Sequence, residues 1–165
     1  MQIFEVINER RSIRAYKDEP IEKEKIDRLI ESARLAPTAA NRQKFKLVIV
    51  NYEEKDLKNK LVTACNEQQF VGMASNIIAG VSEEPDYKWE QVDLAIVLEH
   101  IVLEAVELGL GTCWIGAFKE NEVKKLLKIP KDKRVVALLA IGYPAENPPA
   151  RPRKDISELI SYNQY

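Results

Sequence analysis

Apolar residues recur at helical spacing in the first third of the chain. Ile3, Phe4 and Ile7 predict a short helix that ends near the basic residues at 10–14. Apolar side chains at 26, 29, 30 and 33 follow the i, i+3, i+4, i+7 pattern and predict an amphipathic helix over about 22–35. Pro37 cannot continue that helix, so we expect a loop over 36–43.

Strand and helix patterns alternate through the middle of the chain. A β-branched run at 47–50 predicts a first strand over about 46–51. Apolar residues between Leu57 and Cys65 predict a third helix, and residues 76–81 predict a second strand.

The segment 90–108 is apolar around most of its circumference rather than along one stripe. A helix of that kind is expected to be central. A domain of this size can hardly bury every side of such a helix within one subunit, so we hypothesise that it packs against its copy in a homodimer.

The last elements are a strand over 112–115, a helix over 121–127 and a strand over 135–141. The nearly continuous apolar run of the last strand predicts burial on both faces. Periodicity alone therefore indicates an α/β or α+β domain. The alternation after Lys46 fits a parallel doubly wound sheet as well as a mixed one.

Length and charge bound the function. The 165 residues, 45% of them hydrophobic, predict one domain over 1–165 with a linker-like stretch only at 144–152. The 25 Lys+Arg balance 26 Asp+Glu, so no bulk field favours nucleic acid or an anionic membrane, and we expect neither as a partner. Any anion site must be a local cluster.

Cysteine, histidine and glycine usage narrows the chemistry further. Cys65 and Cys113 form no CxxC and follow no secretory leader pattern, which predicts a reduced, cytoplasmic setting. The lone His100 excludes an HExxH site, and we expect no metal. Neither a phosphate loop nor a GxGxxG turn occurs, so side chains must hold any nucleotide-like ligand.

The densest local charge lies at Arg10, Arg11, Ser12 and Arg14. Guanidinium groups donate bidentate hydrogen bonds at fixed geometry, so this cluster could cradle a phosphate dianion. The alternative is that arginines at a helix carboxyl end simply interact favourably with the helix dipole.

Two later segments could contact a planar ligand. In the loop 36–43, the amides of Asn41 and Gln43 suit the edge of a heterocycle, although Asn41 could simply make a turn. At 116–117, Gly116 and Ala117 leave backbone N–H groups open to a ligand. We interpret Cys113 as a buried structural thiol and His100 as a hydrogen-bonded packing or interface residue.

Taken in order, five segments resemble the nitroreductase family of FMN-dependent oxidoreductases. The resemblance spans nearly the whole chain and rests on 10–14 with Pro20, 36–43, 92–105, 109–118, and 141–144 with the tail arginines. It implies an α+β fold with a central mixed or antiparallel sheet flanked by helices. It also implies a homodimer with the long helix buried at its interface and FMN in clefts between the subunits.

The resemblance also assigns residues to the cofactor. The phosphate site would comprise Arg10, Arg11, Ser12, Arg14, Arg151 and Arg153, the last two in a carboxyl-terminal arm over about 145–165 that reaches the partner subunit. The flavin ring would contact Pro37, Thr38, Ala39, Asn41, Gln43, Trp114, Ile115, Gly116 and Ala117. No catalytic side chain is assigned, because the cofactor carries the difficult step.

The resemblance implies an alternating reaction in which NADH or NADPH delivers hydride to N5 of FMN and a nitroaromatic, quinone or similar small acceptor then takes it. Two other hypotheses use the same residues: an FMN storage or sensor protein without turnover, and a dimeric interaction module that binds another phosphate. Two departures bear on the acceptor. Lys44-Phe45 stands where many members have Pro-Trp, and the connection 82–90 is too short for the helical excursion of longer relatives.

Overall fold

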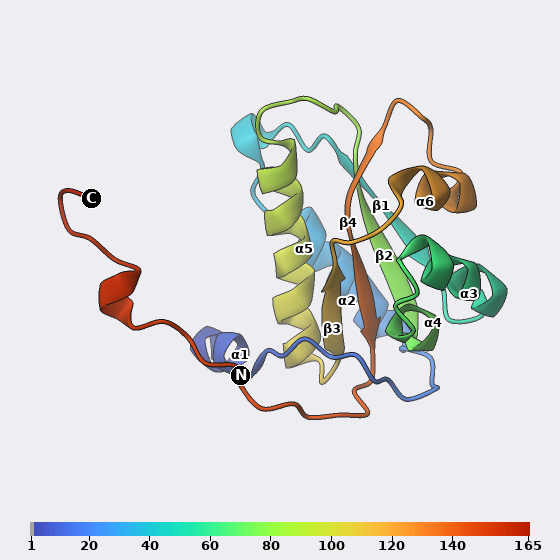
Figure 1. Ribbon diagram of the computed structural model, residues 1–165, viewed down its shortest axis with the longest axis horizontal. Helices are drawn as coiled ribbons and strands as arrows, with labels where there is room; N and C mark the ends of the chain where they lie inside the picture. Colours follow the sequence, from blue (N-terminus) through green and yellow to red (C-terminus); the bar gives the residue numbers. More distant parts are fainter. Residues whose placement is uncertain (1) are drawn as a thin grey trace.

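The computed structural model describes residues 2–165 and has a four-stranded sheet at its centre (Figure 1). The strands are β1 (Phe45–Val50), β2 (Asn76–Ser82), β3 (Gly111–Ile115) and β4 (Arg134–Gly142). They pair in the order β1-β2-β4-β3, and every pair is antiparallel. The fold is therefore α+β, and the parallel doubly wound arrangement that periodicity left open does not occur.

Helices cover both faces of this sheet. On one face lie α2 (Lys23–Arg34) and the long α5 (Glu90–Glu107), which pack against each other and against the sheet. On the other lie α3 (Lys55–Ala64), α4 (Phe70–Met73) and α6 (Glu120–Leu127). The two central strands, β2 and β4, are buried almost throughout, which confirms the predicted double burial of 135–141.

The predicted helices and strands agree with the observed ones to within one or two residues. The first helix is α1 (Ile3–Glu9), and α2 ends at Arg34 before Pro37, as expected from the fixed φ of proline. Three short elements were not predicted: α4 and the 3₁₀ turns η1 (Ala39–Asn41) and η2 (Ile156–Glu158). They are too short to carry a readable period.

The long helix α5 is buried on one side only within a single chain. Its inner face, including Leu94, Leu98 and Ile101, is fully buried against the sheet. Its outer face carries Val92, which is 45% exposed, and Ala95, which is also exposed. A helix that is apolar on most sides thus leaves part of its apolar surface uncovered.

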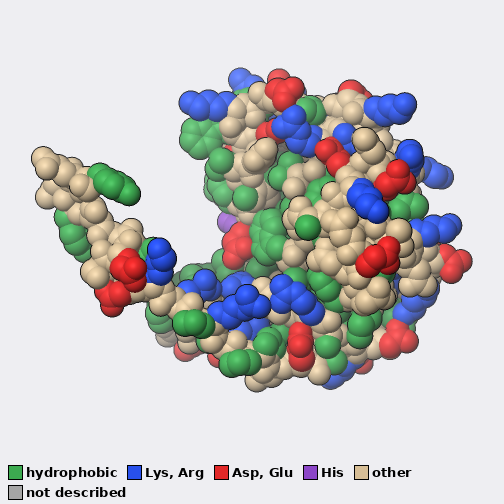
Figure 2. Space-filling view, viewed as in Figure 1, with side chains coloured by type: hydrophobic (Ala, Val, Ile, Leu, Met, Phe, Trp, Pro, Cys, Tyr) green, Lys and Arg blue, Asp and Glu red, His purple; other side chains and the backbone are tan. Residues whose placement is uncertain are grey.

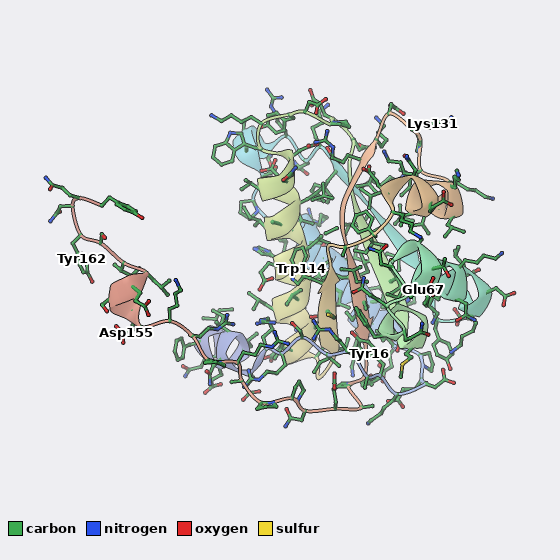
Figure 3. All side chains as sticks on the ribbon, in the orientation of Figure 1. Tyr16, Glu67, Trp114, Lys131, Asp155 and Tyr162 are labelled. Carbon is green, nitrogen blue, oxygen red and sulfur yellow. The ribbon has the colours of Figure 1, made fainter. Side chains whose placement is uncertain are left out.

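The chain after β4 forms an arm, residues 145–165, that extends away from the sheet and helices (Figure 1). Asp155 and Tyr162 lie far out on it (Figure 3). Its apolar side chains are exposed, among them Ile156, Leu159 and Tyr162. None of the helices within residues 2–165 is both long and apolar enough to cross a membrane.

Candidate functional site

The basic segment after α1 is fixed to the edge of the sheet by backbone contacts. Ser12 forms a bridge with Thr112 of β3, and the N–H of Ile13 donates to the carbonyl of Thr112 at 2.9 Å. Gly111 permits this approach, because a Cβ there would lie 2.6 Å from a side-chain carbon of Ile13. The hydroxyl of Tyr16 donates to the carbonyl of Ile13 at 2.7 Å (Figure 3). The residues at 10–14 are therefore presented by a rigid strip.

The arm completes a hollow beside this strip. The hollow has a volume of about 470 Å³ and contains the arginines at 10, 11, 14, 151 and 153, which we call the arginine hollow. Figure 2 shows Lys and Arg side chains gathered where the arm leaves the body of the molecule. The rest of the lining is Phe4, Ile7, Asn8, Ser12, Pro148, Pro149 and Ala150. The fold thus brings together all six residues predicted to hold a phosphate.

The five guanidinium groups of the arginine hollow lack acidic partners. Among residues 2–165, no carboxylate oxygen lies within 4.0 Å of any of them, whereas the other four arginines of the chain each form an ion pair. The carboxylate of Glu146 accepts instead from the backbone N–H groups of Arg14 and Ala15, at 2.5 and 3.1 Å. Glu146 was not predicted from the sequence, because nothing local links it to Arg14.

Arg11 also has a structural role at the carboxyl end of α1, which the sequence did not predict. Its Nη1 donates to the carbonyls of Asn8 and Arg10 at 2.6 and 2.9 Å, which caps the carboxyl end of α1. Its Nε is buried and has no partner within the described chain. Arg11 therefore combines a capping contact with one unsatisfied donor.

The loop 37–43 has a strained backbone. Ala40, Asn41 and Gln43 all have φ near 52°, in the left-handed region that disfavours residues with a Cβ. Such conformations cost on the order of 1–2 kcal/mol for each residue, least for asparagine. Surrounding contacts must therefore hold this loop in place.

Side chains of the loop hydrogen-bond to one another. The Oγ1 of Thr38 accepts from the N–H of Gln43 at 3.1 Å, and the Nε2 of Gln43 donates to Asn41 Oδ1 at 3.0 Å. Asn41 and Gln43 are exposed, so their remaining amide atoms are free to face a ligand. The loop also reaches another element, since the N–H of Ala39 donates to Asp93 Oδ1 of α5 at 2.9 Å.

The end of β3 lies beside the outer face of α5. Trp114 is half-buried and, with Val92, Ala95 and Ile96, lines a second, shallow hollow of about 500 Å³ (Figure 3). Beyond it, Gly116 has no positive φ, and a Cβ added to it would meet nothing within 4 Å. The described chain itself gives no reason for a glycine there.

Within one chain these predicted ring contacts are not gathered into one cavity. Neither hollow described above is lined by a residue from 37–43, and only Trp114 represents the end of β3. The two residues that replace Pro-Trp of many family members lie just after the loop. The Nζ of Lys44 is 3.9 Å from Oε2 of Glu84, and Phe45 pairs with Ser82 at the start of β1. The residues predicted to hold a phosphate therefore line one hollow of the single chain, whereas the residues predicted to contact a ring do not together line either hollow.

The two thiols are unsuited to nucleophilic chemistry. Cys65 and Cys113 are free and buried, and burial raises the pKa of both, that of Cys65 to about 11. A thiol with a raised pKa is protonated at neutral pH and unreactive. The predicted burial of Cys113 is confirmed. The Nδ1 of His100 lies 3.1 Å from the carbonyl of Ser32, which fits a hydrogen-bonded packing role.

The sequence matches that of known proteins along most of its length. The sequence profile described as the nitroreductase family matches residues 7–81 and 71–143. A protein of Archaeoglobus fulgidus, described as a candidate NADH dehydrogenase or NAD(P)H nitroreductase, is 31% identical over 154 residues, which cover 88% of this chain and 87% of that protein. The FMN reductase [NAD(P)H] of Bacillus subtilis is 29% identical over 175 residues and covers 92% of this chain and 70% of its own.

Solved structures agree with the sequence comparison. A nitroreductase family protein from Clostridium novyi has a TM-score of 0.83 and 34% identity, over 96% of this chain and 91% of that one. The shared architecture therefore extends over nearly all of the chain.

Proposed function

The chain belongs to the nitroreductase family and is an oxidoreductase, and from this we propose that it binds FMN and transfers electrons from NADH or NADPH to a small-molecule acceptor. The observation that carries the proposal is the arginine hollow. Five guanidinium groups without a carboxylate partner among residues 2–165, one of them with an unsatisfied Nε, make this hollow a favourable place for an anion.

The phosphate of FMN matches this donor set. Arg10, Arg14, Arg151 and Arg153 would supply charge-assisted hydrogen bonds and Ser12 a hydroxyl, while Arg11 adds charge from the end of α1. The backbone contacts of the strip 12–16 hold Ser12 and Arg14 in place before a ligand arrives. This part of the site is therefore preorganised, which reduces the ordering cost of binding.

The isoalloxazine ring would lie between the loop 37–43 and the end of β3. Pro37, Thr38, Ala39, Asn41 and Gln43 offer a small-residue surface with two exposed amides. Trp114, Ile115, Gly116 and Ala117 would flank the other side, with the N–H of Gly116 or Ala117 facing the reactive part of the ring. The open space at Gly116 supports this placement, because only a molecule outside the described chain could require a glycine there.

When bound, FMN supplies the redox chemistry by accepting hydride at N5 and passing it to an acceptor such as a nitroaromatic or quinone. The residues of this chain bind and orient the cofactor, and the short connection between β2 and α5 leaves the proposed ring surface open to both substrates. Donor and acceptor would therefore use the same surface in turn. Parallel initial-rate plots are expected, and intersecting plots would contradict the alternating scheme.

We further propose that the working unit is a homodimer with FMN at the subunit interface. The outer face of α5 and the exposed Ile3, Phe4 and Ile7 of α1 form apolar surfaces that a second copy could cover. The arm could then reach across the partner with its exposed apolar side chains. Sedimentation should give a dimer at micromolar concentration, and a monomer would exclude this arrangement.

The decisive experiment is a visible absorption spectrum of the desalted protein, before and after anaerobic addition of NADH and then NADPH. A yellow protein that bleaches on adding either nucleotide supports the proposed function and identifies the donor. Yellow colour that persists would replace it with flavin storage or sensing. A colourless protein that takes up no added FMN would overturn the proposal and favour another phosphate ligand.

A further inference from the structure

Asp93 connects the loop 37–43 to the longest helix of the protein. Its side chain is buried, 6% exposed, and its Oδ1 accepts from the N–H of Ala39 at 2.9 Å. Asp93 lies in the first turn of α5, where its own N–H donates to the carbonyl of Trp89 at 2.8 Å. A carboxylate at this end of a helix is favoured by the helix dipole. The anchor is therefore both rigid and electrostatically stable.

The contact is placed where the loop most needs support. Ala39 begins the 3₁₀ turn η1, and the strained Ala40, Asn41 and Gln43 follow directly. Thr38, the residue before this turn, makes no capping hydrogen bond to it, because its Oγ1 accepts from Gln43 instead. Asp93 supplies the missing acceptor from another part of the molecule.

Other ties to the loop are weaker or lie beyond it. Within the described chain, no other hydrogen bond joins residues 37–43 to a different helix or strand. The guanidinium carbon of Arg42 lies 4.7 Å from the centre of the Tyr87 ring, and its Nη1 lies 4.0 Å from Oε2 of Glu84. The N–H of Glu83 donates to the carbonyl of Lys44 at 3.1 Å, just after the loop. The amino-terminal half of the loop depends on Asp93.

We propose that Asp93 is a positioning residue for the flavin ring: through Ala39 it holds Thr38, Asn41 and Gln43 in the strained arrangement that contacts the cofactor. This inference rests on the proposed function, since it assigns the loop to the ring of FMN. Asp93 itself needs no contact with the cofactor. Its effect passes through the backbone of the loop.

Two substitutions separate anchoring from charge. Asp93→Ala removes the acceptor, whereas Asp93→Asn keeps an oxygen that can accept from Ala39. Lys58→Met is the matched control, because Lys58 is also a buried polar anchor, donating to the carbonyls of Ala74 and Ser75 on the opposite face of the sheet. It reports on a general loss of stability.

The first readout uses the protein without FMN. Trypsin cleaves after Arg42 and Lys44, which lie in and just after the loop, so mass spectrometry of limited digests measures how often the loop opens. We expect Asp93→Ala to accelerate these two cleavages at least about tenfold, as the loss of a hydrogen bond to a charged group implies. Asp93→Asn and Lys58→Met should stay within about threefold of the unmodified protein. Equal acceleration by Lys58→Met would overturn the anchoring role.

The second readout is FMN itself, followed by quenching of its fluorescence and by its visible spectrum. Asp93→Ala should lower the affinity for FMN about tenfold or more and shift the absorption bands of the flavin. Asp93→Asn should show the affinity and the spectrum of the unmodified protein. Unchanged affinity and spectrum in Asp93→Ala would overturn the proposal. If the unmodified protein binds no FMN, the proposed function fails and with it the assignment to the ring, while the trypsin result still establishes or excludes the anchor.

Discussion

The arginines of this protein fall into two groups that differ in their partners. Arg28, Arg34, Arg42 and Arg134 each pair with at least one carboxylate, and only Arg134 reaches a buried one, that of Glu90. The five in the arginine hollow have none within residues 2–165 and lie side by side at the base of the arm. Gathering like charges costs free energy, so the second arrangement indicates a site for an anion, whereas the first stabilises the fold.

A single buried cation without a carboxylate partner, such as Lys58, does not indicate an anion site. The amine of Lys58 is fully buried, yet it donates to the carbonyls of Ala74 and Ser75 at 2.8 and 3.0 Å. It is thus satisfied by backbone oxygens and fixes α3 to the segment after α4. What marks the arginine hollow is the combination of clustering, an open hollow and unsatisfied donors.

The largest effect is expected from removing two arginines of the hollow. Each charge-assisted hydrogen bond contributes about 1.5–3 kcal/mol. The double variant Arg14→Ala, Arg153→Ala should therefore bind FMN less tightly by about 3–6 kcal/mol. The free energy of unfolding should change little, because neither guanidinium stabilises the fold through an ion pair. Titration of FMN fluorescence measures the first quantity and urea unfolding the second. Unchanged FMN affinity would remove both residues from the site.

The opposite result is expected for the buried ion pair. Arg134 donates to Asp86 at 2.7 Å and to Glu90, whose carboxylate is only 6% exposed. Arg134→Ala leaves that buried charge without its partner and should lower the free energy of unfolding clearly, by more than the loss of any exposed ion pair. Arg134→Lys should recover part of the loss. A weakening of FMN without a loss of stability would reverse the distinction between the two groups.

Lys58 should make stability depend on pH in the alkaline range. Burial lowers its pKa from 10.5 to about 8, so the unfolded chain binds more protons than the folded one between pH 8 and 10.5. Its contribution therefore rises with pH through that window, by about 1–3 kcal/mol. Cys65 and Tyr16, whose pKa values burial raises, act in the opposite direction.

The difference between the unmodified protein and Lys58→Met isolates this contribution. Urea unfolding at roughly pH 7.5 and 10, on either side of the pKa of Lys58, gives the free energy of unfolding of both proteins. The unmodified protein should become more stable relative to the variant as the pH rises. A constant difference would mean that Lys58 keeps its proton throughout and that its two carbonyls fully offset its burial.

The smallest effect is expected at an exposed pair. Arg34 donates through Nε and Nη2 to the carboxylate of Glu31, both at 2.6 Å, on the surface of α2. Exposed pairs of this kind contribute little to stability, so Arg34→Ala should hardly change the free energy of unfolding and should leave the affinity for FMN as it was. The same assays apply, and a tenfold loss of FMN affinity in this variant would show that net charge, rather than the hollow, governs binding.

Local sequence predicted the elements well because their signals are local. Helical spacing at 26–33 and the β-branched run at 47–50 act within a few residues, and α2 and β1 follow them closely. The strand order could not be predicted in this way, since the pairing of β4 with both β2 and β3 joins residues far apart in the chain. The resemblance to a known family supplied the α+β class with a mixed or antiparallel sheet, but not the order of the strands.

The candidate site likewise has a part that the local sequence predicts and a part that depends on contacts between distant residues. The cluster at 10–14 is visible in the sequence as five adjacent residues, and the amides at 41 and 43 are visible as a polar loop. The contacts of Glu146 with Arg14 and of Asp93 with Ala39 join residues 132 and 54 positions apart. No local pattern reports such contacts.

By itself the sequence determined the helices and strands, the apolar character of 90–108 and the presence of a basic cluster, because spacing and composition act over a few residues. The tertiary structure decided which strands pair, which arginines lack partners and what holds the loop 37–43 in its strained form. Those features depend on which distant segments meet, and segments meet according to how the whole core packs.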